Sequence, residues 1–199
     1  MVVLVLTLVS VLRETIAQGN ATVRSSACNG WVSLPPSINP WRCLTTLETG
    51  EYVRGNMHML TMCFCVVYLP PQLNVLSDKL YIPLPVTVPA LASVTGIELT
   101  LEKYCQRGVV RDSSIQLATN QSAVGNAKSS NATWASIDSF YNYGSTIDDW
   151  GYKWTSTDVS KLGVIVVCAN DATIPANHVA ITSASVTVFY GTSIFLYHH

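Results

Sequence analysis

The chain has 199 residues, of which 12% are charged, and its formal net charge is −1. The charged fraction is about half of the usual value. This balance excludes a typical nucleic-acid-binding protein, because contacts to phosphates require clustered Lys and Arg side chains. The length suits one all-β domain with a full core better than two domains.

The N-terminal segment is the apolar run VVLVLTLVSVL, followed by RETIAQ. The run is too short for a transmembrane helix, and Thr15 and Ala17 fit the small residues before a signal-peptidase cut. Residues 1–17 are therefore predicted to be a secretory signal peptide or a retained N-terminal connector strand. Residues 18–199 are predicted to form a single β-sandwich domain.

A retained N-terminal strand has two interpretations. Without a partner in its own chain, it would suit donor-strand exchange, in which each subunit completes the sheet of the next. The simpler alternative is a strand in its own sheet.

Residues 28–56 are rich in turn-forming residues and are predicted to be loops. Residues 57–69 form a nearly continuous apolar strand that ends at two prolines. A short strand over residues 79–84 follows, and further prolines interrupt the chain after it.

Residues 94–117 have the periodicity of a β-sheet. In VTGIELTLEKY the apolar Ile97, Leu99 and Leu101 alternate with polar residues, and Ile115 and Leu117 continue the alternation after a short connection. Each segment must bury one face. The two are therefore predicted to be neighbouring strands of an antiparallel sheet that lies on a core.

The C-terminal half adds predicted strands at residues 134–143, 152–154, 163–169 and 179–190. The only helical signal is one turn in TSTDVSKLG, with Ser156 as the N-cap. Eight or more short strands separated by turns predict an all-β fold, an antiparallel β-sandwich of jelly-roll type.

The six cysteines are spread along the chain and do not have the spacing of a zinc site. A disulfide framework is the first interpretation, which also favours an extracellular location. On a strand, Cys63 and Cys65 would share a face with Cα atoms roughly 6.5–7 Å apart, so we expect them to bond to different partners. Cys105 and Cys168 each end a predicted strand and are the favoured pair. The disulfide candidates are Cys28, Cys43, Cys63, Cys65, Cys105 and Cys168.

Three N-x-S/T sequons begin at Asn20, Asn120 and Asn131. The last two flank the polar stretch NQSAVGNAKSSNAT, which is predicted to face solvent. All three asparagines are candidate glycosylation sites if the chain passes through a glycosylating secretory route.

The motif DDWGYKW has a structural and a functional interpretation. Gly151 allows a sharp bend between Trp150 and Trp154, so that one indole closes the end of the core. Alternatively, aromatic side chains bind the apolar faces of sugar rings while Asp148 or Asp149 accepts hydroxyl hydrogen bonds. That glycan-binding surface would consist of Tyr141, Tyr143, Trp150 and Tyr152. Elsewhere, Asp112 suits a turn-capping carboxylate.

The sequence offers little evidence of catalysis. The soft ligands in MHMLTMCFC could attract Cu(I), but core-filling methionines and disulfide-bonded cysteines are the simpler explanation. Asp148 and Asp149 would face opposite sides of a strand, and His178, His198 and His199 lack a recognisable catalytic motif. No catalytic residue, metal site or cofactor is predicted, and we do not expect an enzyme.

Several motifs in residues 79–190 occur together in a known kind of module. They are IPLP, TGIELTLEK, VRDSSIQL, the Val124-Gly125 pair with Lys128, Trp134, YGSTIDDWGYKWTSTDVSKLGVIVV and ASVTVFY. This region resembles a β-sandwich module of phage tail-fibre or appendage proteins and of bacterial extracellular surface proteins. The module is usually poor in cysteine, and the N-terminal half of the chain is not matched. The resemblance implies an exposed, assembled structural or attachment role.

Two functions are therefore expected. The first is a structural subunit of an extracellular filament, surface appendage or virion surface, which would assemble with copies of itself through β-sheet contacts. The second is a glycan-binding adhesin or lectin-like module. Neither function requires a nucleic acid or a membrane span.

Overall fold

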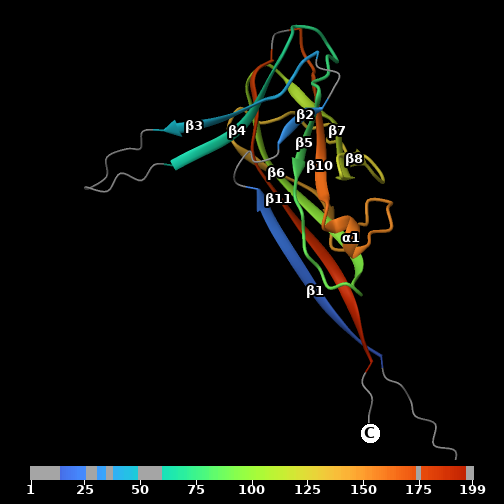
Figure 1. Ribbon diagram of the computed structural model, residues 1–199. Helices are drawn as coiled ribbons and strands as arrows, with labels where there is room; N and C mark the ends of the chain where they lie inside the picture. Colours follow the sequence, from blue (N-terminus) through green and yellow to red (C-terminus); the bar gives the residue numbers. More distant parts are fainter. Residues whose placement is uncertain (1–13, 26–30, 35–37, 49–59, 174–175, 196–199) are drawn as a thin grey trace, which may run out of the picture.

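The computed structural model describes residues 14–25, 31–34, 38–48, 60–173 and 176–195. These residues form two antiparallel β-sheets and one short helix, α1 (Ser156–Val159) (Figure 1). The first sheet consists of β1 (Glu14–Ser25), β3 (Arg42–Glu48), β4 (Leu60–Leu69), β6 (Ser93–Arg107), β9 (Ser139–Ser145) and β11 (Ala176–Phe195). The second consists of β2 (Val32–Leu34), β5 (Lys79–Pro83), β7 (Val110–Thr119), β8 (Ser122–Ala123) and β10 (Leu162–Asn170).

The strand order is that of a jelly roll. The first sheet contains the order β4-β11-β6-β9 and the second the order β5-β10-β7-β8. From β4 to β7 the chain changes sheet at every connection, and it changes again from β8 to β11. These eight strands form two sheets of the jelly-roll type. The prediction of an all-β jelly-roll sandwich is confirmed, and β1, β2 and β3 are additions at its edges.

The relation between β6 and β7 differs from the sequence prediction. The two strands are not neighbours in one sheet, because β6 pairs with β11 and β9 whereas β7 pairs with β10 and β8. The alternation of apolar and polar residues shows only that one face of a strand is buried, and this is true of a strand in either sheet of a sandwich. The short connection after Arg107 therefore crosses between sheets, so that β6 and β7 face each other across the core.

Other local predictions had mixed outcomes. The strands predicted at 57–69, 79–84, 163–169 and 179–190 correspond to β4, β5, β10 and β11. Residues 28–56 were predicted to be loops but contain β2 and β3, whereas 152–154 form no strand.

The predicted helical turn is present as α1, but its N-cap is Thr155 rather than Ser156. The Thr155 hydroxyl accepts a hydrogen bond from the Asp158 N–H, and the Asp158 carboxylate accepts one from the Thr155 N–H. This reciprocal pair is a capping box.

The structural interpretation of DDWGYKW is confirmed. Trp150 is fully buried at a φ of 59°, Gly151 follows at a φ of 67°, and the Trp150 indole N–H donates to the Ile97 carbonyl at 2.9 Å. Trp154 is also buried and donates its indole N–H to the Asp149 carbonyl. The two indoles therefore close one end of the core while the chain turns between them.

The longest strand extends beyond the sandwich. β6 pairs with β11 from Asn177 to Gly191, whereas β1 pairs with β11 from Ala184 to Phe195. Among the described strands, the end of β11 is therefore paired with β1 alone. The two strands form an arm, defined here as β1 together with residues 184–195. Residues 184–191 are still paired with β6, and only the outer end of the arm, where residues 192–195 pair with β1, projects from the sandwich (Figure 1).

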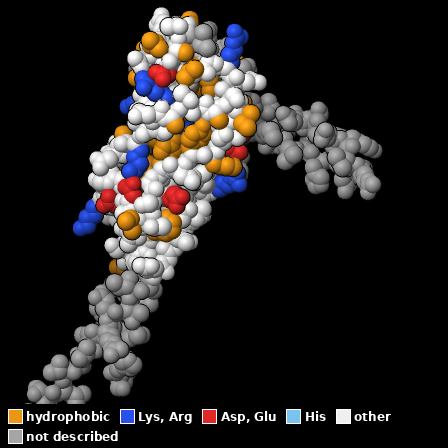
Figure 2. Space-filling view, turned by 180° about the vertical axis from the view of Figure 1, so that it is seen from behind, with side chains coloured by type: hydrophobic (Ala, Val, Ile, Leu, Met, Phe, Trp, Pro, Cys, Tyr) orange, Lys and Arg blue, Asp and Glu red, His pale blue; other side chains and the backbone are white. Residues whose placement is uncertain are grey.

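Charged side chains are sparse on the surface. Figure 2 shows the Lys, Arg, Asp and Glu side chains of one face in a few small groups, between hydrophobic side chains and a larger area of other side chains and backbone. In the parts of the chain that the structure describes, no helix is long and apolar enough to cross a membrane.

Candidate functional site

The most unusual side chain in the core is Lys103. On β6 the buried residues Ile97, Leu99 and Leu101 occupy every second position, and Lys103 is the next member of the same series. Its side chain is 0% exposed. Because successive side chains of a strand point to opposite faces, the lysine amine must enter the space between the sheets.

Asp112 reaches the same space from the opposite sheet. It lies on β7 and pairs with Cys168, and the register between β7 and β10 shifts immediately after it, leaving Ser113 as an extra residue. This β-bulge keeps Asp112 on the buried face with Val110, while the alternation resumes one residue later at Ile115. Asp112 is therefore not the turn-capping carboxylate that the sequence suggested.

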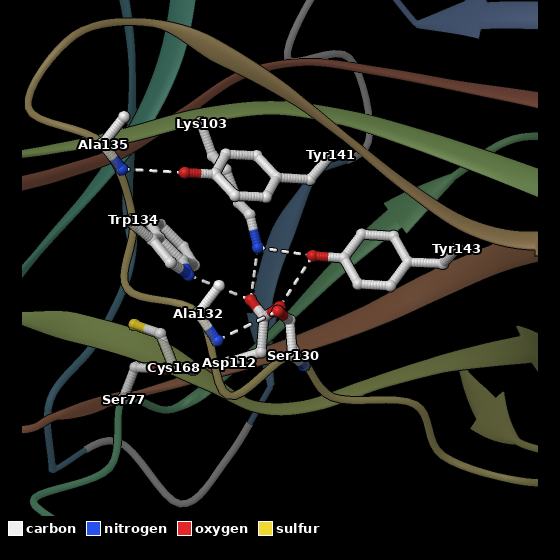
Figure 3. A network of polar contacts seen from close by, with 10 residues as sticks. All are labelled: Ser77, Lys103, Asp112, Ser130, Ala132, Trp134, Ala135, Tyr141, Tyr143 and Cys168. Atoms are coloured by element: carbon white, nitrogen blue, oxygen red, sulfur yellow. Dashed lines mark hydrogen bonds and ion pairs between the residues drawn. The ribbon is translucent and has the colours of Figure 1, made fainter.

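Lys103 and Asp112 form the centre of a buried polar cluster (Figure 3). The Lys103 ammonium nitrogen contacts Asp112 Oδ1 and lies 2.5 Å from the Tyr143 hydroxyl oxygen. Tyr143 donates its hydroxyl to Asp112 Oδ2 at 2.7 Å. Trp134 donates its indole N–H to Oδ1 at 2.9 Å, and the Ser130 N–H donates to Oδ2 at 3.3 Å. Both oxygens of the carboxylate are therefore occupied.

Aromatic rings surround the lysine amine. Lys103 Nζ lies 4.4 Å from the ring centres of both Trp134 and Tyr141, and 5.2 Å from that of Tyr143. These distances are within the range of cation–π attraction. Tyr141 is held in place by a hydrogen bond from the Ala135 N–H to its hydroxyl, at 2.7 Å. The amine is thus enclosed by rings on the sides that the carboxylate does not occupy.

Burial changes the acid–base properties of this cluster. Desolvation lowers the pKa of Lys103, although the charge and hydrogen bond of Asp112 oppose that shift. Desolvation also raises the pKa of Tyr143, and the negative charge of Asp112 raises it further. The environment therefore favours a neutral amine more than water does, and it keeps the phenol protonated.

The sequence contained a signal for this cluster that the prediction did not use. The alternation that marks Ile97, Leu99 and Leu101 as buried continues to Lys103, which places a charged residue at a core position. A charge at such a position requires a buried partner. Asp112 could not be chosen as that partner, because the bulge and the change of sheet are not visible in the sequence.

The predicted glycan-binding surface is not present. Trp150 is 0% exposed and Tyr143 is 7% exposed, so neither ring can lie against a sugar. Tyr141 and Tyr152 are only partly buried, but both pack against the core. The four rings therefore do not form one exposed surface, because Trp150 and Tyr143 fill the space between the sheets and its open end.

The three sequon asparagines are accessible. Asn20 lies on β1, Asn120 in the turn between β7 and β8, and Asn131 in the loop before β9, and all three are exposed. Asn120 and Gln121 have φ values of 50° and 67°, which fit a tight two-residue hairpin turn. Their positions are compatible with glycosylation, which stays a prediction.

The cysteines only partly follow the prediction. Cys43 and Cys65 face each other on β3 and β4 and form a disulfide. The predicted pair of Cys105 and Cys168 is wrong, because both are buried free thiols. Cys105 lies on β6 and Cys168 on β10, in opposite sheets, and the Cys105 thiol instead donates to the Arg107 carbonyl at 3.1 Å. Cys28 and the Cys63 side chain lie outside the described residues.

The candidate copper ligands lie outside the described residues: Met57, His58 and Met59 entirely, and Met62 with its side chain. The same holds for the other histidines considered above, namely the side chain of His178 and all of His198 and His199. Within the described residues, no three His, Cys, Asp or Glu side chains are grouped as a metal site. Asp148 forms an ion pair with Lys128 at 2.7 Å, and Asp149 accepts a hydrogen bond from the Gly151 N–H. These carboxylates therefore stabilise the turn around Trp150.

A groove of about 390 Å³ lies where the arm leaves the sandwich. Tyr190 of β11 lies across Gly19 of β1, since a Cβ atom on Gly19 would be 2.9 Å from the tyrosine ring. The groove therefore combines an aromatic ring with hydroxyl and amide groups. Its lining consists of Gln18, Gly19, Thr95, Thr146, Ile147, Phe189 and Tyr190.

No known protein-family model matches this sequence, and no curated protein is significantly similar to it. The resemblance to phage and bacterial surface modules thus stays a prediction.

Proposed function

We propose that this chain is a structural subunit of an extracellular assembly, such as a filament, a surface appendage or a virion surface. The arm formed by β1 and β11 carries this proposal. Its outer part is a two-stranded ribbon, and an isolated two-stranded ribbon is at best marginally stable in water. Contact with a neighbouring copy would supply the additional strands or the apolar surface that the ribbon lacks.

Three further properties support an assembled role outside the cell. The sandwich contains the Cys43–Cys65 disulfide, which is typical of oxidising compartments. The chain has few charges, so long-range repulsion between copies is weak. The exposed asparagines of the three sequons could carry glycans without disturbing the core.

Two arrangements of strands could join neighbouring copies. From Gln18 to Arg24 every second side chain of β1 is exposed, whereas Ala21 and Val23 pack against the core. A neighbouring strand could pair with the outer edge of β1, or β1 could exchange and pair with β11 of the next copy. In the described fold β1 pairs with β11 of its own chain. Donor-strand exchange through residues 2–12 stays a proposal, because the structure does not describe those residues.

Sedimentation velocity and negative-stain microscopy of the purified chain test this proposal. We expect the wild-type protein to form oligomers or filaments at high concentration, and Asn20→Lys to weaken this association because an edge lysine disfavours strand pairing. Ser122→Lys on exposed β8 adds the same charge away from the arm and is the matched control. A wild-type chain that stays monomeric, or an equal effect of the two substitutions, would contradict the proposal.

Glycan binding is the second candidate function, and the groove beside Tyr190 favours it. An aromatic ring next to hydroxyl and amide groups suits a sugar ring, which has an apolar face and polar edges. A glycan array comparing the wild type with Tyr190→Ala, and with Tyr68→Ala at an exposed tyrosine elsewhere, tests it. Loss of binding only in Tyr190→Ala would support a lectin. The absence of any bound glycan would exclude this candidate.

A further inference from the structure

We propose that Lys103 and Asp112 condense to form an intramolecular amide, an isopeptide bond that crosslinks the two sheets of the sandwich. Their side chains contact each other directly and are both 0% exposed. One comes from β6 and the other from β7, on opposite sides of the core. This inference does not depend on assembly or glycan binding.

The first requirement is an amine that can act as a nucleophile. An ammonium ion has no free electron pair, so Lys103 must lose a proton before it attacks a carbonyl carbon. Burial lowers the pKa of Lys103 and thereby increases the neutral fraction. The aromatic rings around Nζ exclude the water that would otherwise stabilise the charge.

The second requirement is a path for protons between the two groups. The Tyr143 hydroxyl lies 2.5 Å from Lys103 Nζ and 2.7 Å from Asp112 Oδ2, so it touches both reacting groups. Its position allows it to accept a proton from the nitrogen while it donates its own to Oδ2. Because burial raises the pKa of Tyr143, the phenol stays protonated and able to donate.

The atoms of the reaction balance without any further reactant. The electron pair of Lys103 Nζ attacks Asp112 Cγ, the Nζ–Cγ bond forms, and the Cγ–Oδ2 bond breaks. Starting from the ion pair, two of the three protons on Nζ are transferred to Oδ2, which leaves as water. The third remains as the amide N–H, and neither carbon nor nitrogen changes its oxidation state.

Trp134 stabilises the charge that develops during the attack. Its indole N–H donates to Asp112 Oδ1 at 2.9 Å, and Oδ1 is the oxygen that becomes the amide carbonyl. A donor already directed at this oxygen stabilises the tetrahedral intermediate. The enclosed cluster then disfavours hydrolysis, because the released water leaves an apolar site.

A second lysine–aspartate pair provides the internal comparison. Lys128 Nζ lies 2.7 Å from Asp148 Oδ2 and 4.9 Å from the centre of the Trp150 ring. The side chains of this pair are 28% and 30% exposed, so water solvates both charges. We therefore expect it to remain a salt bridge.

Peptide mapping of the full-length protein is the decisive experiment. The protein is unfolded, its disulfides are reduced, and trypsin is added before mass spectrometry. With the bond present, cleavage after Lys103 is blocked, and the peptides 80–107 and 112–128 are recovered as one branched species, one water lighter than their sum. Fragmentation should locate the link at Lys103 and Asp112. Without the bond trypsin cleaves after Lys103, so recovery of the peptides 80–103 and 112–128 as separate, full-mass species from the wild type would overturn the proposal.

Variants separate the chemistry from the fold. Lys103→Arg and Asp112→Ala should abolish the branched peptide, whereas the matched control Lys128→Arg should retain it. Tyr143→Phe should keep the near-ultraviolet circular dichroism spectrum of the native fold. In freshly synthesised Tyr143→Phe protein the linked fraction should accumulate at least tenfold more slowly, because a single acid–base group typically contributes a rate factor of about 100 or more. Linking at the wild-type rate in Tyr143→Phe would remove the hydroxyl from the mechanism.

Discussion

Lys103 and Asp112 are nine residues apart in the chain and meet in the core between the two sheets, where neither side chain is exposed. The short connection from β6 to β7 places them on opposite layers rather than on adjacent strands. Their contact therefore joins the layers directly, in a place where a jelly roll usually has only apolar packing.

The first prediction concerns the free energy of unfolding. Lys103→Met should destabilise the protein by at least about 3–5 kcal/mol, because it leaves the Asp112 carboxylate buried without its counter-ion and also removes the proposed crosslink. Lys103→Met combined with Asp112→Asn should be clearly more stable than Lys103→Met alone, since the amide oxygen can accept from Trp134 without a charge. Urea denaturation followed by tryptophan fluorescence measures each value.

The partly exposed pair of Lys128 and Asp148 is the control for that prediction. Lys128→Met should cost no more than about 1 kcal/mol, because water screens this pair. An equal loss for Lys103→Met and Lys128→Met would contradict the importance of burial.

The second prediction concerns alkaline pH. Burial raises the pKa of Cys168 from 9.0 to about 12, so the folded protein keeps this proton at pH values where the unfolded chain has released it. The stabilisation is fully present below pH 9 and is lost as the pH rises toward 12. Comparing Cys168→Ala with the wild type at about pH 8 and about pH 11 should show that the variant loses less stability on going to the higher pH.

Thiol labelling gives an independent check of Cys168. We expect iodoacetamide to modify it only after unfolding, because the thiol is fully buried and the reactive thiolate is suppressed. Rapid labelling of the native protein at Cys168 would contradict this environment.

The third prediction concerns Gly144 on β9. Its φ is 80°, and a Cβ atom there would lie 2.1 Å from the Ile97 carbonyl oxygen and 2.7 Å from the Trp150 indole nitrogen. Gly144→Ala should therefore lower the free energy of unfolding by about 2 kcal/mol or more. Thermal denaturation followed by circular dichroism measures the loss.

Gly151 is the comparison for Gly144. It also has a positive φ, but the three atoms nearest to a Cβ atom there all belong to the Asn126 side chain, which can move. Gly151→Ala should cost less than Gly144→Ala, and the reverse order would show that the backbone contact to Ile97 is not the source of the strain.

The fourth prediction concerns the Cys43–Cys65 disulfide, which links residues 22 apart in sequence. Replacing both cysteines with alanine should destabilise the protein by about 3 kcal/mol, mainly because the unfolded chain gains freedom. Urea denaturation of the double variant measures the change. Alanine at Cys105, which is a free thiol, leaves the disulfide intact and is the control.

The sequence alone determined the fold class and much of the strand framework. Alternating apolar residues in β6 and the apolar runs of β4 and β10 depend only on burial and on the two-residue period of a strand. The role of Trp150 was also predictable, because a bulky ring beside Gly151 in a turn needs a place in the core.

The tertiary structure alone decided which residues meet. Whether β6 and β7 share a sheet, which sulfur atom faces Cys65, and how the bulge after Asp112 directs its carboxylate all depend on strand order and register. Local patterns do not encode these relations, since one alternation fits either layer of a sandwich. For that reason the sequence marks Lys103 as a charge at a core position, but only the packed sheets place Asp112, Tyr143 and Trp134 around it.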